Sequence, residues 1–207
     1  MISPRLDELF STVYDDLEQT IPAAYQSALR HAKSFQEEIA KVARMLDQSE
    51  QNWSCRPGSG VKDAHRILEK AAKFGVGVPR DLLGAKFVVS SLRSAYELAN
   101  ALIEQQTLLE FVGFNDRFVD PQPSGYRDLQ FEALFKGLVV EIKICHALMD
   151  EVDDIEHKIY EIVRALQTRG DRLTSSERMV LEQLTKTFKR LYTDAWNEIP
   201  RQERSGL

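Results

Sequence analysis

Cysteine is scarce in this sequence of 207 residues. The two cysteines, Cys55 and Cys145, lie far apart and form no Cys-x-x-Cys pair. Small secreted scaffolds depend on several paired cysteines, and structural zinc sites depend on closely spaced ones. The sequence therefore argues against both classes, and we expect the chain to work in a reducing cytoplasm.

Long apolar runs are also missing. No run approaches the roughly 20 residues that a helix needs to cross a bilayer. The first ten residues, MISPRLDELF, are polar and mixed in charge, which is not the pattern of a secretory signal. We therefore expect no membrane partner.

Positive charge is not in excess. The formal net charge is −5, with 27 lysine and arginine residues against 32 aspartate and glutamate residues. Proteins that bind long nucleic acids non-specifically rely on a positive field, so this charge argues against that class of function. It leaves room for one local basic pocket.

The pattern of apolar residues predicts an α+β fold. Recurrence every three or four positions predicts helices over 4–48 (interrupted near Pro22), 61–74, 92–105, 147–168 and 175–197. Short β-rich runs predict strands over 85–90, 108–114, 129–134 and 138–145. Glycine and proline predict loops over 54–60 and 115–125, and Thr174 with Glu177 has the spacing of a helix capping box. We expect a small mixed β-sheet flanked by helices, with helical N- and C-terminal extensions.

The last two predicted strands form a hairpin whose geometry can be worked out directly. A tight turn at 136–137 sets the register of the strands that it joins. This register places Glu132 opposite Glu141 and Gln130 opposite Lys143, all on one face of the sheet. Two directly opposed carboxylates repel, and a cation such as Mg²⁺ between them would relieve that cost. The alternative is a solvent-facing surface on which the acids point apart into water.

The segment that precedes this hairpin, SGYRDLQ at 124–130, resembles the Gly-Tyr-Arg segment of RelA/SpoT synthetases, where the tyrosine stacks on the acceptor base. Further segments resemble motifs of that family in the same order along the chain. They are the phosphate-gripping helix (61–70), the Asp-x-x-Gly-x-Arg strand (81–86), the acceptor loop (116–121), the Glu-Val-Gln-Ile strand (140–144) and the helix after it (156–160). The resemblance covers about residues 60–164. It implies a synthetase domain over 51–168, between a helical extension (1–50) and a C-terminal helix packed on the domain (169–207).

The resemblance implies a pyrophosphokinase that transfers pyrophosphate from ATP to the 3′-hydroxyl of a guanine or adenine nucleotide, with Mg²⁺ as cofactor. Asp81 and Glu141 would bind the metal and serve the chemistry. ATP would be held by Lys62, Arg66, Lys70 and Lys86, the first three of which share one helix face by their spacing of four. The acceptor would be held by Tyr126, Arg127, Gln130, Lys143 and His157. The plainer alternatives are surface acids, a solvated basic face, a core tyrosine and a packed helical histidine.

Four positions depart from the family pattern and predict relaxed or altered acceptor choice. They are Lys86, Asn115, Gln122 and Lys143. The departures favour as an alternative a toxin-like relative, which would make an adenine alarmone or pyrophosphorylate the 3′ end of tRNA. A third alternative is a nucleotide-binding module without catalysis. An antitoxin partner and a homo-oligomer are both left open by the resemblance.

Overall fold

The computed structural model describes residues 21–46, 53–56, 58, 60–62, 67, 79–104 and 107–205. The helices are α2 (Ile21–Leu46), α4 (Leu92–Glu104), α5 (Ala147–Arg169), α6 (Ser175–Glu198) and α7 (Arg201–Arg204), with a 3₁₀ turn at Gly170–Arg172. The strands are β1 (Trp53–Arg56), β2 (Gly84–Val89), β3 (Glu110–Asp116), β4 (Leu129–Phe135) and β5 (Leu138–His146). The α+β fold with helical terminal parts is confirmed. None of the described helices is long and apolar enough to cross a bilayer.

The five strands form one mixed sheet in the order β1-β2-β5-β4-β3. Strand β2 pairs in parallel with β5, and the other neighbours are antiparallel. Lys136 and Gly137 both have positive φ, 52° and 77°, as a type I′ hairpin turn requires. The predicted register of the hairpin is confirmed, with Glu132 opposite Glu141 and Gln130 opposite Lys143.

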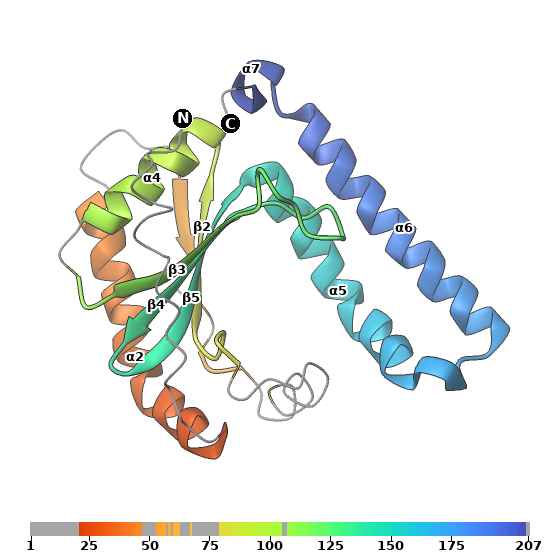
Figure 1. Ribbon diagram of the computed structural model, residues 1–207, viewed down its shortest axis with the longest axis horizontal. Coiled ribbons are helices and arrows are strands. Elements are labelled where there is room, and N and C mark those ends of the chain that lie inside the picture. The colour runs from red at the N-terminus through yellow and green to blue at the C-terminus, as the bar shows by residue number, and fades with distance from the viewer. Residues whose placement is uncertain are drawn as a thin grey trace.

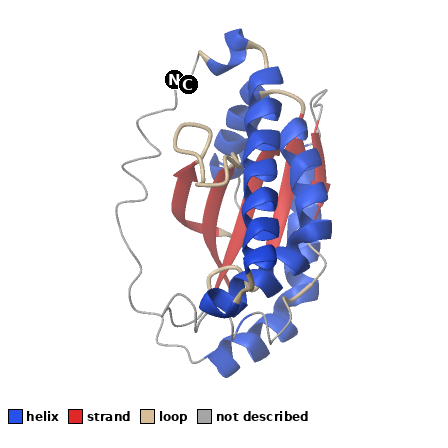
Figure 2. Ribbon diagram, turned by 90° about the vertical axis from the view of Figure 1, so that its right-hand side faces the viewer, coloured by secondary structure: helices blue, strands red, loops and turns tan. Residues whose placement is uncertain are grey.

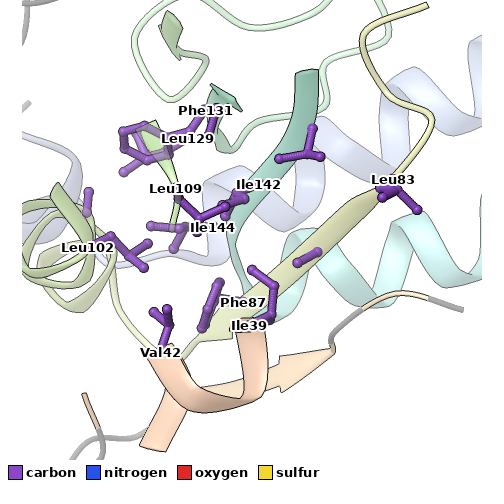
Figure 3. Packing of buried hydrophobic residues seen from close by; sticks show 14 of the residues in the cluster. Ile39, Val42, Leu83, Phe87, Leu102, Leu109, Leu129, Phe131, Ile142 and Ile144 are labelled. Carbon is purple, nitrogen blue, oxygen red and sulfur yellow. The ribbon is translucent and has the colours of Figure 1, made fainter. Parts of the chain in front are cut away.

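Helices cover both faces of the sheet (Figure 1). Helices α2 and α4 lie against one face, and α5 and α6 lie on the other side, so that α6 stands in front of the sheet in Figure 2. Alternate side chains of each strand point toward α2 and α4, where Phe87, Phe131, Ile142 and Ile144 are buried (Figure 3). The intervening side chains of the central strands are largely polar. We call this side of the sheet the polar face. A second, smaller apolar cluster is formed by residues of α5 and α6 together with Tyr126: Met149, Val152, Phe188 and Tyr192.

The first strand corrects a prediction, because residues 54–60 were expected to form a loop. Trp53–Arg56 instead forms the edge strand β1, whose partner is β2, and the Trp53 ring packs edge-on against Phe87 at 5.6 Å. Gly58 and Gly60 follow the strand rather than interrupt it. Pairing with a distant strand is a tertiary interaction, which local composition does not report.

Two element boundaries also differ from the predictions. Strand β3 begins two residues later than expected, since the N–H groups of Leu108 and Leu109 are bound outside the sheet by Glu38 and Thr107 (3.1 and 3.2 Å). It also runs on to Asp116, into the stretch expected to be loop. The helix predicted over 61–74 does not begin at Val61, which lies in a bend. The rest of that helix lies outside the described residues, apart from the helical, buried Ile67.

Both long C-terminal helices begin with a side-chain cap. The predicted capping box is confirmed: the Thr174 hydroxyl accepts the N–H of Glu177, and the Glu177 carboxylate accepts the N–H of Thr174. Helix α5 is capped by His146, whose Nδ1 accepts the N–H of Leu148 at 3.1 Å. Its Nε2 lies 3.1 Å from the carbonyl of Ser90. The ring must therefore be neutral, with its proton on Nε2.

This cap predicts that acid destabilises α5 through His146. Burial lowers the pKa of His146 in the fold, so protonation penalises the folded state as pH falls through the unfolded pKa near 6.5. His146→Asn keeps a capping side chain without a titration, at a cost of about 1 kcal/mol at pH 7.5 for the lost Ser90 bond. We expect the stability gap between the two proteins, measured by urea unfolding, to narrow at pH 5.5. An equal gap at both pH values would contradict a neutral capping role.

Candidate functional site

The register of the sheet arranges the polar face in two rows. The first row crosses all five strands and consists of Arg56, Lys86, Lys143, Gln130 and Asn115. The next row consists of Gly84, Glu141, Glu132 and Gly113. Glycines thus flank the two acids, and a side chain added at Gly113 would come within 3.1 Å of the Glu132 carboxylate. Three cationic side chains therefore lie beside two carboxylates, and the other members of the two rows are two amides and two glycines.

Each of the two opposed glutamates pairs with a cationic side chain of the protein. Glu132 pairs with Arg80 at 2.8 Å, while Glu141 pairs with Lys143 at 3.2 Å and accepts a hydrogen bond from Gln130. The acids therefore do not point freely into water, which was the alternative expectation, and a metal ion at Glu141 stays a prediction. The repulsion is relieved by two cations, one of which reaches the sheet from the segment before β2.

A second carboxylate, Asp81, lies in the turn before β2. The backbone N–H of Glu141 donates to the carbonyl of Leu83 at 3.0 Å, which brings the segment containing Asp81 alongside β5. The Asp81 carboxylate pairs with the Lys62 ammonium, and the Lys62 backbone N–H donates to Leu82 at 3.2 Å. Asp81 thus lies in the turn just before β2, whose first residue, Gly84, is the partner of Glu141. Each of the two carboxylates pairs with a lysine ammonium.

This donor set fits Mg²⁺ only in company with a substrate. Within the described part of the chain, no cluster of three histidine, cysteine or carboxylate groups could hold a metal ion alone. Mg²⁺ is commonly bound by one or two carboxylates together with substrate phosphates and water. Asp81 and Glu141 would supply the carboxylates, and the paired ammonium groups show that both positions favour positive charge.

The first row is called the cationic row below, after Arg56, Lys86 and Lys143. Helix α5 forms ion pairs with two of these residues, Arg56 and Lys86. Lys86 donates to Asp150 at 2.9 Å and to Asp153 at 2.6 Å, and Arg56 pairs with the same Asp150 at 2.7 Å. Burial alone would lower the pKa of Lys86, but the two carboxylates raise it well above its usual value. Burial alone would raise the pKa of Asp153, but His157 and Lys86 together lower it to about 2. Lys86 and Asp153 are therefore charged at neutral pH, and their ion pair holds α5 against the sheet.

Tyr126 lies in a turn that is covered by α6. Its side chain is only 5% exposed, and its ring meets Tyr192 edge-on at 5.5 Å. The preceding Gly125 has φ of +89°, and a Cβ there would lie 3.3 Å from the Cβ of Tyr192. The Lys143 ammonium lies 6.0 Å from the centre of the Tyr126 ring. The ring thus faces the cationic row while α6 covers it from outside.

Comparison with solved structures identifies the fold. The small alarmone synthetase 2 from Bacillus subtilis matches with a TM-score of 0.57 and 22% identity, over 83% of this chain and 89% of that chain. A GTP pyrophosphokinase family protein from Streptococcus pneumoniae matches with a TM-score of 0.52 and 17% identity, over 90% of this chain and 93% of that chain. The small alarmone synthetase 1 from Bacillus subtilis, bound to its product pppGpp, matches with a TM-score of 0.50 and 19% identity, over 83% and 90% of the two chains.

The chain has the fold of the small alarmone synthetases. No protein-family model and no curated protein sequence matches it. At these identities the likeness establishes the fold and leaves the roles of single residues to the geometry.

On this alarmone-synthetase fold, the structure brings together six of the residues that the sequence assigned to a site. They lie on or beside the polar face: Lys62, Asp81, Lys86, Gln130, Glu141 and Lys143. Arg66 and Lys70, expected to bind ATP, lie outside the described residues. The role of each residue in binding remains a prediction.

Three other predicted residues have different surroundings. The Arg127 guanidinium lies 4.2 Å from the centre of the Trp196 ring of α6 and donates to the carbonyl of Phe118, so it packs with the C-terminal helix. Tyr126 is buried, as the alternative of a core tyrosine anticipated. His157 is mostly exposed and contacts Asp153 of its own helix, which raises the His157 pKa.

Two residues at this site, Arg117 and Arg80, carry no role predicted from the sequence. Arg117 pairs with the fully buried Asp128 at 3.3 Å and donates to the Gln130 side chain. Arg80 neutralises Glu132. Arg117 stood inside a recognised motif without an assigned role. Arg80 left no local signal, because its partner lies on a strand far along the chain.

Proposed function

We propose that this chain is a pyrophosphokinase that moves a pyrophosphate group from ATP to a nucleotide hydroxyl. The observation that supports this best is that Asp81, in the turn before β2, and Glu141, on the neighbouring β5, each pair with a lysine ammonium. Two carboxylates with adjacent cations suit a magnesium–polyphosphate complex. The alarmone-synthetase fold is consistent with this chemistry.

Pyrophosphoryl transfer depends mainly on positioning and charge neutralisation. The acceptor oxygen bonds to the β-phosphorus of ATP, the bond from that phosphorus to the α-phosphate oxygen breaks, and AMP leaves. Bound Mg²⁺ would neutralise the charge on the transferred group. Lys62 and Lys143 would contact phosphate oxygens, and the Glu141 carboxylate would orient the attacking hydroxyl and accept its proton.

The test is to incubate the protein with labelled ATP, Mg²⁺ and one acceptor at a time, and then to resolve the products. GDP, GTP, ADP, ATP and tRNA are the acceptors to compare. We expect AMP together with a pyrophosphorylated acceptor, and loss of both products with Asp81→Asn. Failure to transfer pyrophosphate to any of the five acceptors would favour the nucleotide-binding module without catalysis.

The same assay tests the expected change in acceptor choice. Lys143 is a cation where the family pattern has a glutamine, and Asn115 is an uncharged amide where the pattern has a lysine. These changes alter the charge and the hydrogen bonds offered to an acceptor. We expect transfer to more than one acceptor, or to an adenine nucleotide or tRNA in preference to a guanine nucleotide. Strong selectivity for GDP or GTP would contradict this expectation. Transfer to tRNA would favour the toxin-like alternative.

Tyr126→Ala should impair acceptor use much more than ATP binding. Stacking of a base on an aromatic ring contributes roughly 1–3 kcal/mol, so the acceptor KM should rise about 5- to 150-fold. Tyr126→Phe is the matched control, since it keeps the ring and should leave the acceptor KM nearly unchanged. Both variants need a check of thermal stability, because the side chain is buried. A loss of ATP affinity with unchanged acceptor dependence would contradict the stacking role.

A further inference from the structure

The side-chain amide of Gln130 is held at both ends. Its Oε1 accepts hydrogen bonds from Arg117 and, at 3.4 Å, from Asn115, while its Nε2 donates to Oε2 of Glu141. A guanidinium group carries donors only, so the amide oxygen must face Arg117 and the amide nitrogen must face Glu141. Gln130 is also 9% exposed. Its orientation is therefore determined by the protein.

Arg117 is anchored in turn by a buried acid. Its guanidinium lies 3.3 Å from Oδ1 of Asp128, and its backbone N–H donates to the carbonyl of the same residue at 2.9 Å. Asp128 is fully buried. A continuous line of contacts thus runs from Asp128 through Arg117 and Gln130 to Glu141.

The far end of this line leaves Glu141 little freedom. Its Oε2 accepts from Gln130, and its Oε1 lies 3.2 Å from the Lys143 ammonium. A glutamate side chain has three rotatable bonds, and contacts at both oxygens select one arrangement of them. An error of about 1 Å in the placement of a reacting group can cost roughly 100-fold in rate.

We propose that Arg117 and Gln130 are positioning residues, which hold the Glu141 carboxylate in its working orientation without touching the substrate. This inference rests on the proposed function and reassigns Gln130, which the sequence analysis placed among the acceptor-binding residues. Gln130 would act on the rate of the chemical step, whereas an acceptor-binding residue would act mainly on the acceptor KM.

Two variants of Gln130 and one of Arg117 test this. Gln130→Leu removes both hydrogen bonds, while Gln130→Glu keeps an acceptor for Arg117 and loses the N–H that faces Glu141. We expect each to lower kcat about 10- to 100-fold, with the ATP dissociation constant and the acceptor KM changed less than threefold. Arg117→Leu should lower kcat to a similar extent, and Arg117→Lys should recover part of that loss in kcat. The double variant with Arg117→Leu and Gln130→Leu should have a kcat no lower than that of either single variant, because both residues act through Glu141. A rise in the acceptor KM at unchanged kcat, or additive losses, would overturn the inference.

A structural readout separates this inference from the proposed function. A crystal structure of the wild-type chain should show Glu141 in one rotamer. A crystal structure of Gln130→Leu should show Glu141 displaced or in several rotamers. An inactive wild-type protein would contradict the proposed function, and the rotamers of Glu141 would still decide the positioning. An unmoved Glu141 in Gln130→Leu would overturn the positioning role.

A second inference concerns the turn that carries Tyr126. Three consecutive residues, Gly125–Arg127, contact α6: the glycine lies under Tyr192, the Tyr126 ring meets the ring of Tyr192, and Arg127 lies over Trp196. The Tyr192 hydroxyl donates to Glu156 of α5, which fixes the ring from behind. Tyr192 is fully buried, and Tyr126 is left 5% exposed.

We infer that α6 is an internal cover of the acceptor-binding turn. A base that stacks on Tyr126 needs the surface beside the ring that Tyr192 partly occupies, so acceptor binding and full docking of α6 compete. This inference also rests on the proposed function. The cationic row and the Asp81–Glu141 pair carry no described contact with Tyr192, so ATP binding is expected to be independent of the cover.

Tyr192→Ala tests the cover, because it should lower the acceptor dissociation constant and KM about 3- to 10-fold with ATP affinity unchanged. Tyr192→Phe, which loses the bond to Glu156 but keeps the ring, should have a smaller effect in the same direction. Hydrogen exchange of residues 188–196 in the wild-type protein should increase when the preferred acceptor is added. Weaker acceptor binding in both variants would place Tyr192 in the acceptor site itself and overturn the inference. Unchanged acceptor affinity together with unchanged hydrogen exchange of residues 188–196 would show that α6 does not cover the turn, and would also overturn it. Acceptor binding and exchange are measured without turnover, so they do not depend on transfer activity.

Discussion

Glu141→Gln should lower the rate of pyrophosphate transfer on the order of 100- to 1000-fold while leaving the fold intact. The amide has the same shape and can still accept from Lys143, but it has no negative charge with which to bind a metal ion or accept a proton. The measurement is the rate of AMP formation with ATP and the preferred acceptor, with far-ultraviolet circular dichroism and thermal unfolding as checks on the fold.

The chain offers a matched control for this variant in the opposed acid, Glu132. It lies directly across from Glu141 on the neighbouring strand and is paired with Arg80. Glu132→Gln should therefore change the rate less than about fivefold, since Glu132 has no assigned part in the chemistry. Near-normal turnover in a folded Glu141→Gln protein would remove Glu141 from the metal site. Equal losses in both variants would mean that the general charge of the polar face, and not Glu141, supports the activity.

Asp150→Ala should lower the free energy of unfolding by about 3 kcal/mol, which is the largest stability effect that we expect of a single polar substitution in this chain. Asp150 is 4% exposed and accepts from both Lys86 and Arg56. Its removal leaves the largely buried Lys86 with Asp153 as its one described partner. Urea unfolding at pH 7 measures the loss.

Asp154→Ala is the control, because Asp154 pairs with the same Arg56 at 3.3 Å but is mostly exposed. Exposed ion pairs contribute about 0–1 kcal/mol, so this variant should be almost as stable as the parent. Similar losses in both variants would show that burial does not distinguish the two aspartates.

The depressed pKa of Asp153 adds a pH test. The contribution of Asp153 to the free energy of unfolding is present above the unfolded pKa near 3.9 and is lost as pH falls toward about 2.

Local patterns predicted many of the helices and strands. The helices over 92–105, 147–168 and 175–197, the hairpin and the capping box at Thr174 all match the structure closely, because apolar periodicity and turn chemistry act over a few residues. The edge strand β1 was missed, since a four-residue strand draws its stability from pairing with β2 rather than from its own composition.

The sequence predicted one feature of the candidate site and not others. The opposition of Glu132 and Glu141 followed from the turn alone, and the structure reproduces it. The ion pairs that neutralise these acids did not follow, because Arg80 is supplied by another segment of the chain. The two aspartates of α5 that bind Lys86 did not follow from the sequence either, and its role in binding ATP stays a prediction.

The sequence by itself determined the polar face and its register, because a two-residue turn with positive φ at Lys136 and Gly137 admits one alignment of its strands, and strand side chains alternate strictly. Only the tertiary structure decided which charges on that face stay available and what covers Tyr126. Those outcomes depend on where α5 and α6 pack, and packing brings together residues that no local spacing relates. The physical reason is one of range: hydrogen-bond register and alternation act between neighbours in the chain, whereas burial and ion pairing act between neighbours in space.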